Sequence, residues 1–149
     1  MTYLLDTNVL IRIVRGNRAY FMENFSLDDP SNLTVTSLVS SAEILSFGMQ
    51  NRWGELKVQT ANDLILTFPP VDINDPNIIQ RYAEIDTFSK GKLIGRPLVG
   101  SSRTMGKNDL WIAATASVVS ATLITTDKDF DHLNGEFLRV IYVNPADIT

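Results

Sequence analysis

Short apolar runs of strand length recur along this chain, and stretches with helical character separate them. The five strand-like runs are residues 3–5, 33–36, 71–73, 122–125 and 137–143. Strands that alternate with helices favour a mostly parallel sheet with helices on both faces. We therefore predict an α/β fold, a three-layer α/β/α sandwich with a mostly parallel sheet of about five strands, formed as a single domain over residues 1–149.

Helix signals fill the intervals between these runs. The predicted helices are residues 9–14, 18–27, 38–51, 53–67, 76–91 and 109–120. Gly16 and Asn17 are expected to stop the first helix, and Asn108 is expected to cap the last one. The segment before Asn108 is rich in Gly, Ser, Lys and Arg, and this composition predicts an exposed loop over residues 91–107.

Composition excludes several kinds of site. The chain has no cysteine and a single histidine, His132, which rules out disulfides, thiolate zinc sites, cysteine nucleophiles and multi-histidine metal sites. Hydrophobic residues make up 44% and charged residues 20% of the chain, a globular balance. No apolar run approaches the roughly 20 residues that span a bilayer, and the first residues lack the basic region of a signal peptide. We expect no membrane association and a cytoplasmic location.

The net charge of −4 does not by itself favour a nucleic-acid partner, because phosphate neutralisation supplies much of such affinity. Positive charges nevertheless cluster in two places. One is an arginine group near the start, formed by Arg12, Arg15 and Arg18. The other is a stretch without acids that contains Lys90, Lys92, Arg96, Arg103 and Lys107. This second stretch could be an exposed, solvated loop, and a role in binding phosphate explains it equally well.

Three aspartates stand where strands end or a helix begins. Asp6 follows the first predicted strand and Asp127 follows the fourth, and ligands of parallel sheets bind beyond the carboxyl ends of strands. An acid at a helix N-terminus is also stabilising without any catalytic role, which is a structural explanation for Asp6 and for Asp109. For Asp6 that explanation is weakened, since Thr7 and Asn8 can cap the following helix themselves.

Glu43 lies in a predicted helix, beside an apolar stripe that is expected to face the core. The stripe is formed by residues at helical spacing, Leu38, Ala42, Leu45 and Met49. A carboxylate next to apolar surface needs a partner, because burying an unpaired charge is costly. The partner of Glu43 is therefore expected to be a lysine, an arginine or a metal ion.

The fourth strand is followed by a D-x-D-x-D run, Asp127, Asp129 and Asp131. An EF-hand calcium loop would need glycine and glutamate where this chain has His132 and Leu138. A haloacid-dehalogenase-type phosphatase motif would open its fold, whereas this run lies near the end of the sequence. We interpret Asp127 as a metal-site acid, Asp129 as a supporting one and Asp131 as solvent-facing.

Four segments together resemble the PIN-domain nucleases, and most closely the VapC-type toxins of bacterial toxin–antitoxin pairs. They are residues 4–11 (LLDTNVLI), 42–44 (AEI), 108–114 (NDLWIAA) and 123–130 (LITTDKDF). Each segment alone is a weak signal. In this order they are a strong one, and the resemblance spans essentially the whole chain.

The resemblance implies a role for each matching residue. Carried over by motif, the catalytic and metal-binding acids are Asp6, Glu43, Asp109 and Asp127. The supporting positions are Asn8, Thr126 and Asp129. The charge distribution, and not the family motifs, indicates the basic residues expected to contact RNA, which are Arg12, Lys92, Arg96, Arg103 and Lys107; the long basic loop before Asp109 departs from the family pattern.

Elementary chemistry agrees with this resemblance. Clustered carboxylates raise one another's pKa unless a cation neutralises them, and oxygen ligands without cysteine or histidine favour Mg²⁺ or Mn²⁺. The resemblance thus implies a metal-dependent endoribonuclease, a hydrolase that is the toxin of a type II toxin–antitoxin pair. It also implies RNA as the substrate, a cognate antitoxin as the partner and a homodimer.

Two other functions fit parts of the pattern. A non-cleaving PIN scaffold would bind RNA through the basic stretch without cutting it. A receiver-like signalling domain would need paired acids after the first strand, where Asp6 stands alone. Among substrates, the motifs leave transfer, ribosomal and messenger RNA open, and DNA as well.

Overall fold

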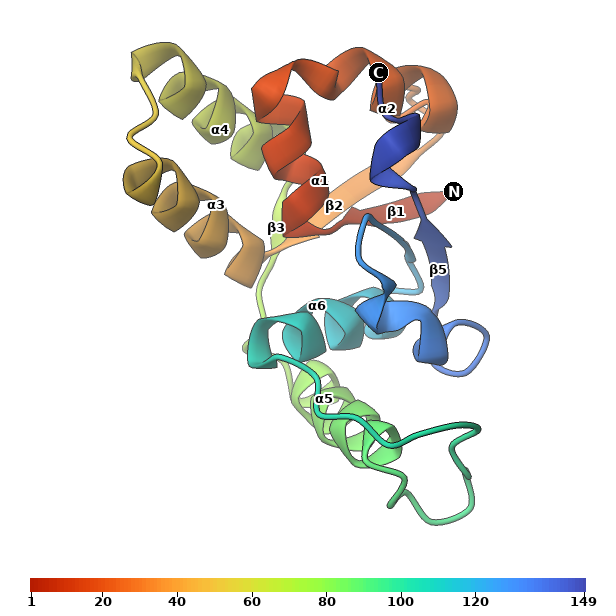
Figure 1. Cartoon of the computed structure of the whole chain (residues 1–149). Helices are drawn as coiled ribbons and strands as arrows, with labels where there is room; N and C mark the ends of the chain where they lie inside the picture. Colours follow the sequence, from red (N-terminus) through yellow and green to blue (C-terminus); the bar gives the residue numbers. More distant parts are fainter.

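A five-stranded sheet lies at the centre of the computed structural model, which describes residues 1–149 (Figure 1). Its strands are β1 (Thr2–Leu5), β2 (Leu33–Ser37), β3 (Pro70–Val71), β4 (Thr122–Thr125) and β5 (Arg139–Tyr142). Their order is β3-β2-β1-β4-β5, and every neighbouring pair is parallel. The first strand of the chain is therefore the middle strand of the sheet.

Helices cover both faces of this sheet. They are α1 (Thr7–Arg12), α2 (Arg18–Phe25), α3 (Leu38–Gln50), α4 (Glu55–Thr67), α5 (Pro76–Ser89) and α6 (Lys107–Val118). Figure 1 shows α1, α2 and α4 on one side of the sheet and α5 and α6 on the other, so the predicted three-layer α/β/α sandwich is confirmed. A π-helical turn, Ile13–Asn17, joins α1 to α2 with Gly16 at φ 110°. None of the helices is both long and apolar enough to cross a membrane.

The sheet separates two hydrophobic cores, and successive strand residues point into opposite ones. Leu4 of β1 and Leu123 of β4 belong to the core beneath α5 and α6. Leu5 and Ile124, the next residues, belong to the core beneath α1 and α4. All four side chains are fully buried. A parallel sheet covered on both faces explains why these strands read as continuous apolar runs rather than alternating ones.

The helix α3 turns a different face to the core from the one its sequence predicts. The predicted core stripe is largely exposed, with Met49 79% accessible. The buried positions are spaced four residues apart and are Ser40, Ile44 and Gly48. Two of these are small, and a Cβ on Gly48 would lie 2.7 Å from the ring of Trp53. Close helix packing through small side chains therefore decides the orientation of α3, and hydrophobic periodicity does not report it.

Several boundaries also differ from the predicted ones. Helix α6 begins at Lys107 with Gly106 as its N-cap, so Asn108 lies in the first turn and is not the cap. Strand β3 stops at Val71 because the Asp72 carboxylate accepts a hydrogen bond from the Asn74 backbone N–H (2.9 Å) and turns the chain. Helix α4 begins later than predicted, and β5 is shorter.

The acidic run after β4 takes a conformation that was not predicted. It folds into a 3₁₀ helix, η2 (Lys128–Leu133), whose N-cap is Asp127. The Asp127 carboxylate accepts a hydrogen bond from the backbone N–H of Asp129 at 2.8 Å. A second 3₁₀ helix, η3 (Pro145–Asp147), follows β5.

Candidate active site

Asp6 lies at the carboxyl end of β1 and is only 3% exposed. Its Oδ1 accepts a hydrogen bond from the Thr7 backbone N–H (2.8 Å), and its Oδ2 accepts one from the Thr125 hydroxyl (2.7 Å). Asp6 is itself the N-cap of α1, so the expectation that Thr7 and Asn8 would take over the capping is wrong. Both carboxylate oxygens are held, which fixes the orientation of the group.

Glu43 reaches the same region from α3, and its side chain is half-buried. Its Oε1 lies 2.7 Å from the Thr7 hydroxyl, which is also 2.8 Å from the Ser40 hydroxyl. No ion pair of the structure involves Glu43, so the expected lysine or arginine partner is absent. A hydroxyl pair takes its place, and the Glu43 charge is not neutralised by any basic side chain.

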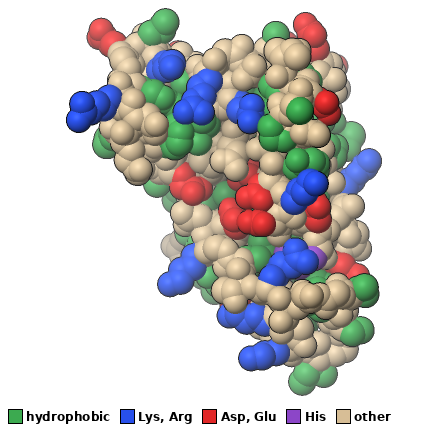
Figure 2. All heavy atoms as spheres, in the orientation of Figure 1, with side chains coloured by type: hydrophobic (Ala, Val, Ile, Leu, Met, Phe, Trp, Pro, Cys, Tyr) green, Lys and Arg blue, Asp and Glu red, His purple; other side chains and the backbone are tan.

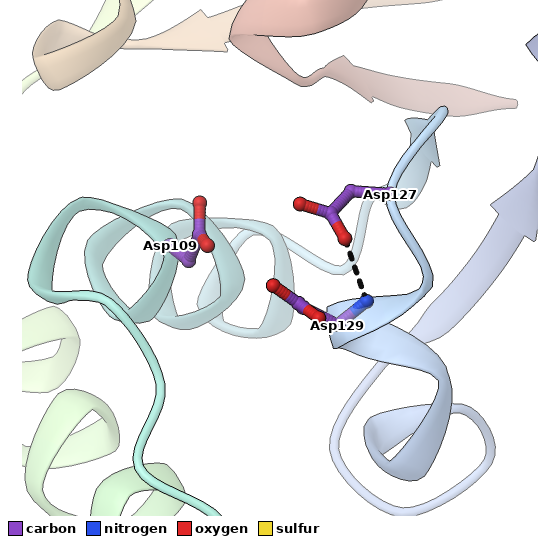
Figure 3. Close-up of side chains that lie close together, drawn as sticks. All are labelled: Asp109, Asp127 and Asp129. Atoms are coloured by element: carbon purple, nitrogen blue, oxygen red, sulfur yellow. Dashed lines mark hydrogen bonds between the residues drawn. The ribbon is translucent and has the colours of Figure 1, made fainter.

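Asp109, Asp127 and Asp129 form the other side of the site (Figure 3). Asp109 projects from the first turn of α6, whereas the two others come from the start of η2. Each offers a carboxylate oxygen, and these oxygens all lie within 4.8 Å of one another. Figure 3 shows the carboxylates of Asp127 and Asp129 pointing toward Asp109. Such spacing suits a shared cation.

Burial and the repulsion of neighbouring charges disfavour the ionisation of Asp6 and Asp109. Burial, followed by the neighbouring charge of Asp109, raises the pKa of Asp6 from 3.8 to about 7, against the opposing effect of the Thr125 hydrogen bond. The pKa of Asp109 rises from 3.8 to about 6, first through burial and then through the charges of Asp127, Glu43 and Asp129. Like charges raise a carboxyl pKa when no cation neutralises them. Asp109 thus couples both sides of the site into one cluster.

The donor set fits a hard divalent cation. Every candidate ligand is a carboxylate oxygen, which Mg²⁺ and Mn²⁺ prefer, and none of the acids of the cluster forms an ion pair with lysine or arginine. Figure 2 shows acidic side chains gathered at the middle of this face, with lysines and arginines above and below them. The positive charge that would lower the pKa of Asp6 and Asp109 must come from outside the chain.

A cleft of about 510 Å³ opens onto the cluster. Asp6, Glu43 and Asp109 line it, together with Asn8 and Asn108. From this end the cleft continues between α1 and α3. The cluster is therefore accessible to a ligand much larger than a metal ion.

Sequence reasoning missed three hydroxyl groups that hold these acids. The Thr7 hydroxyl contacts both Glu43 and the Ser40 hydroxyl. The Thr125 hydroxyl donates a hydrogen bond to Asp6 and accepts one from the Asp127 N–H (3.0 Å). The predicted support, Thr126, takes part in none of these hydrogen bonds. The sequence offered no signal for Thr125: it faces Asp6 because Leu5 pairs with Ile124, so that the next residues of the two strands are neighbours.

The basic residues predicted to contact RNA differ in their surroundings. Lys107 lies next to the acids, in a recess with Glu43 and Asp109. Arg96 is elsewhere, 3.8 Å from the carboxylate of Glu136 and 4.4 Å from the ring centroid of Phe137. Arg12 is half-buried on α1, and Lys92 and Arg103 lie in the segment that precedes α6. Of this set, Lys107 lines a recess that contains acids of the cluster, and Arg103 lies near His132 of η2, whose pKa is lowered first by burial and then by the Arg103 charge.

Comparisons with known proteins agree on one family. The PIN domain family model matches residues 3–136. Ribonuclease VapC1 of Haemophilus influenzae (strain R2866) is 31% identical to this chain over 138 residues, which cover 89% of this chain and 92% of that protein.

Solved structures of toxin–antitoxin proteins share the fold. VapBC-1 from nontypeable Haemophilus influenzae aligns with a TM-score of 0.73 at 26% identity, over 95% of this chain and 98% of that one. VapBC2 from Rickettsia felis, bound to a DNA fragment from its promoter, aligns with a TM-score of 0.78 at 21% identity over the same shares. At 21% identity, the similarity to the Rickettsia felis structure concerns the fold alone.

Proposed function

This chain belongs to the PIN domain family, and from that membership we propose that it is a metal-dependent endoribonuclease, the toxin of a type II toxin–antitoxin pair. Its likeness to ribonuclease VapC1 supports RNA as the substrate. The observation that carries the proposal is a cluster of acids with no basic side chain paired to them: Asp6, Glu43 and Asp109 line one cleft, and Asp109 lies close to Asp127 and Asp129.

Four acids are proposed to hold Mg²⁺ or Mn²⁺: Asp6, Glu43, Asp109 and Asp127. When bound there, such an ion supplies positive charge that activates water and stabilises the charge developing on a phosphodiester. Asp129 lies within ligand distance of two of these acids and supports the site. Asn8 lines the cleft beside Asp6, where its amide can hydrogen-bond the substrate or a water molecule.

The hydroxyl groups around the acids orient them before a substrate arrives. Thr125 holds Asp6, and Thr7 holds Glu43, each at 2.7 Å. Carboxylates that are fixed in this way do not need to reorganise during the reaction, which is how preorganised polar groups lower a barrier. The residues of the chain therefore position charge, and they supply no nucleophile of their own.

The cleft contains no serine–histidine pair that could act as a nucleophile. The one serine–histidine pair is Ser89 and His132, whose Oγ and Nε2 lie 2.7 Å apart. Ser89 is fully buried and also contacts the sulfur of Met105. No substrate can reach its hydroxyl, so this pair fastens η2 to the end of α5. Hydrolysis by activated water is the reaction that remains.

The direct test is cleavage of RNA by the purified chain with Mg²⁺, with Mn²⁺ and with a chelator. We expect cleavage only with metal, and loss of cleavage by at least a hundredfold in Asp6→Asn, as expected for a residue that binds the ion. Asp63→Asn, an exposed position on α4, is the matched control and should cut normally. Metal-independent cutting would contradict the proposed chemistry, and RNA binding without cutting would support the scaffold alternative.

We propose that the antitoxin covers the apolar face of α3 and α4. A recess of about 330 Å³ lies between these helices and is lined mainly by apolar residues, including Leu45, Met49 and Val58. Exposed apolar patches of this kind mark protein–protein contacts. Met49→Lys should weaken co-purification with the cognate antitoxin and leave RNA cleavage intact, whereas an equally stable complex would argue against this surface.

A homodimer is proposed from the family likeness alone. Light scattering of the purified chain should give twice the mass of 16.6 kDa. A monomeric mass at all concentrations would remove the homodimer from the proposal, and it would leave the nuclease site unaffected.

A further inference from the structure

The cleft that contains the acids is longer than the acidic cluster itself. Beyond the carboxylates it runs between α1 and α3 and is lined there by Ile11, Ser46, Phe47 and Gln50. Its volume of about 510 Å³ lies within the range of roughly 300–1,000 Å³ that is usual for ligand pockets. A metal ion with its water ligands fills only part of this space. The end between α1 and α3, which we call the α1–α3 recess, has room for another group.

A positive charge lies next to Phe47, one of the residues that line this recess. The guanidinium of Arg15 lies 5.1 Å from the ring centroid of Phe47, and Phe47 is itself held edge-on against Trp53 with the ring centroids 5.6 Å apart. Arg15 is exposed and takes part in none of the ion pairs of the structure. The aromatic ring positions the guanidinium, whose hydrogen-bond donors stay free for a phosphate.

Gln50 supplies an unused hydrogen-bonding edge in the same recess. One hydrogen of its Nε2 is donated to the Ser46 hydroxyl at 2.9 Å. A primary amide has a second N–H and a carbonyl oxygen, and no other hydrogen bond of the structure occupies them. Glutamine can use such a donor and acceptor together on one base edge. The contact with Ser46 limits the rotation of the amide, so its free edge has a preferred direction.

We propose that the α1–α3 recess binds one unpaired ribonucleotide next to the scissile phosphate, with Arg15 on its phosphate and Gln50 on the edge of its base. This inference rests on the proposed nuclease function. The occupant must be unpaired, because a recess between two helices admits one extruded nucleotide and not a double helix. Sequence-specific RNA recognition generally reads such splayed bases.

The first test compares cleavage sites in a pool of single-stranded RNA with randomised sequence. The unchanged chain should prefer one base at a fixed position beside the cut, and Gln50→Ala should reduce that preference about tenfold, toward equal cutting at all four bases. Gln59→Ala is the matched control, since Gln59 is exposed on α4 and does not line the cleft. Its cleavage pattern should equal that of the unchanged chain.

The second test concerns the phosphate contact. Arg15→Gln should raise KM about tenfold with kcat changed less than twofold, because a contact to a neighbouring phosphate contributes to binding rather than to bond breaking. The salt dependence of kcat/KM should become shallower, with the log–log slope reduced by about 0.7, the value for one phosphate contact on a single strand. Arg139→Gln removes the same charge from β5 and should change neither quantity.

The outcomes separate this inference from the proposed function. If the unchanged chain cuts RNA but Gln50→Ala and Gln59→Ala give one cleavage pattern, base reading by the recess is overturned. The phosphate contact is overturned if Arg15→Gln and Arg139→Gln have equal KM. A failure of the unchanged chain to cut any RNA with Mg²⁺ or Mn²⁺ overturns the nuclease function itself, and the recess loses its proposed occupant with it.

Discussion

The hydroxyl of Thr7 lies 2.7 Å from Oε1 of Glu43 and joins the first turn of α1 to the middle of α3. Thr7 carries one hydroxyl hydrogen, and an ionised Glu43 can only accept it. The Ser40 hydroxyl, 2.8 Å from Thr7, must then donate to Thr7. A directed chain of two hydroxyls therefore fixes the Glu43 carboxylate from one side and leaves its other oxygen to the cleft.

Removing the Thr7 hydroxyl should leave the Glu43 carboxylate less well oriented. We expect Thr7→Val to lower the affinity for Mn²⁺, measured by calorimetry, by about 10- to 100-fold, the usual effect of losing a group that orients a metal ligand. Thr7→Ser keeps the hydroxyl and should restore most of the affinity. Thr67→Val, which removes a hydroxyl bonded only to backbone on α4, should leave it unchanged. Equal affinities in Thr7→Val and Thr67→Val would show that Glu43 needs no such support.

Thr125 should set the pH dependence of the site. Its hydrogen bond lowers the pKa of Asp6, against the burial that raises this pKa to about 7. Without that bond the pKa rises further, and Asp6 must be ionised to bind metal. The acidic limb of the activity–pH profile should therefore move to higher pH in Thr125→Val. The comparison variant is Thr126→Val, because a shift there, with none in Thr125→Val, would favour the residue that the motif indicates.

Metal-free protein should become more stable when Asp109 loses its charge. The folded-state pKa of Asp109 is raised to about 6, so at pH 8 the ionised group is held against neighbouring charges. Asp109→Asn removes that repulsion and should raise the melting temperature at pH 8 in the presence of a chelator, although cleavage is lost. The isosteric change Asp63→Asn on α4 should alter neither property. A lower melting temperature in Asp109→Asn would mean that repulsion is not the dominant effect there.

Stability should respond to pH and Mg²⁺ in opposite ways. Asp6 has a folded-state pKa of about 7 against 3.8 for the unconstrained group, so the folded state binds more protons between about pH 4 and pH 7. Metal-free protein should therefore lose stability as pH rises through this window. Mg²⁺ competes with those protons, and it should raise the melting temperature more at pH 8 than at pH 5.5. A shift that is equal at both pH values would contradict a metal site that includes Asp6.

Gly48 should tolerate no side chain. A Cβ at this position would lie 2.7 Å from the Trp53 ring, which is itself packed against the core. We expect Gly48→Ala to lower the free energy of unfolding in urea by about 1–3 kcal/mol, the usual cost of overpacking. Gly54→Ala has open space around the new methyl group and should cost less. The reverse order would mean that Trp53 moves aside without penalty.

The sequence predicted the architecture because strand-length runs and acids at their ends are local signals. Asp6 and Asp127 follow strands, and the ends of parallel strands meet at one edge of a sheet. The structure places both acids there, with Glu43 and Asp109 nearby, while their catalytic roles stay predictions. The alternation of strands and helices was sufficient to predict the three-layer sandwich.

Properties that depend on packing between elements far apart in the chain could not be predicted from the sequence. The orientation of α3 depends on two small residues of its buried face, Ser40 beside Thr7 of α1 and Gly48 beside the Trp53 ring, and hydrophobic periodicity pointed to the opposite face. The choice between Thr125 and Thr126 depends on which hydroxyl faces the neighbouring strand. That choice follows from the register of β1 against β4, which no local pattern specifies.

The order of the strands also determines when the site can exist. Thr125 and Asp6, which share a hydrogen bond, are separated by 119 residues, and the middle strand β1 precedes its neighbours β2 and β4 along the chain. Until β4 has been synthesised and inserted beside β1, Asp6 has neither its hydroxyl partner nor the acids of η2. The proposed metal site therefore forms only after β4 has been added to the sheet, and a chain that lacks β4 should bind no metal there.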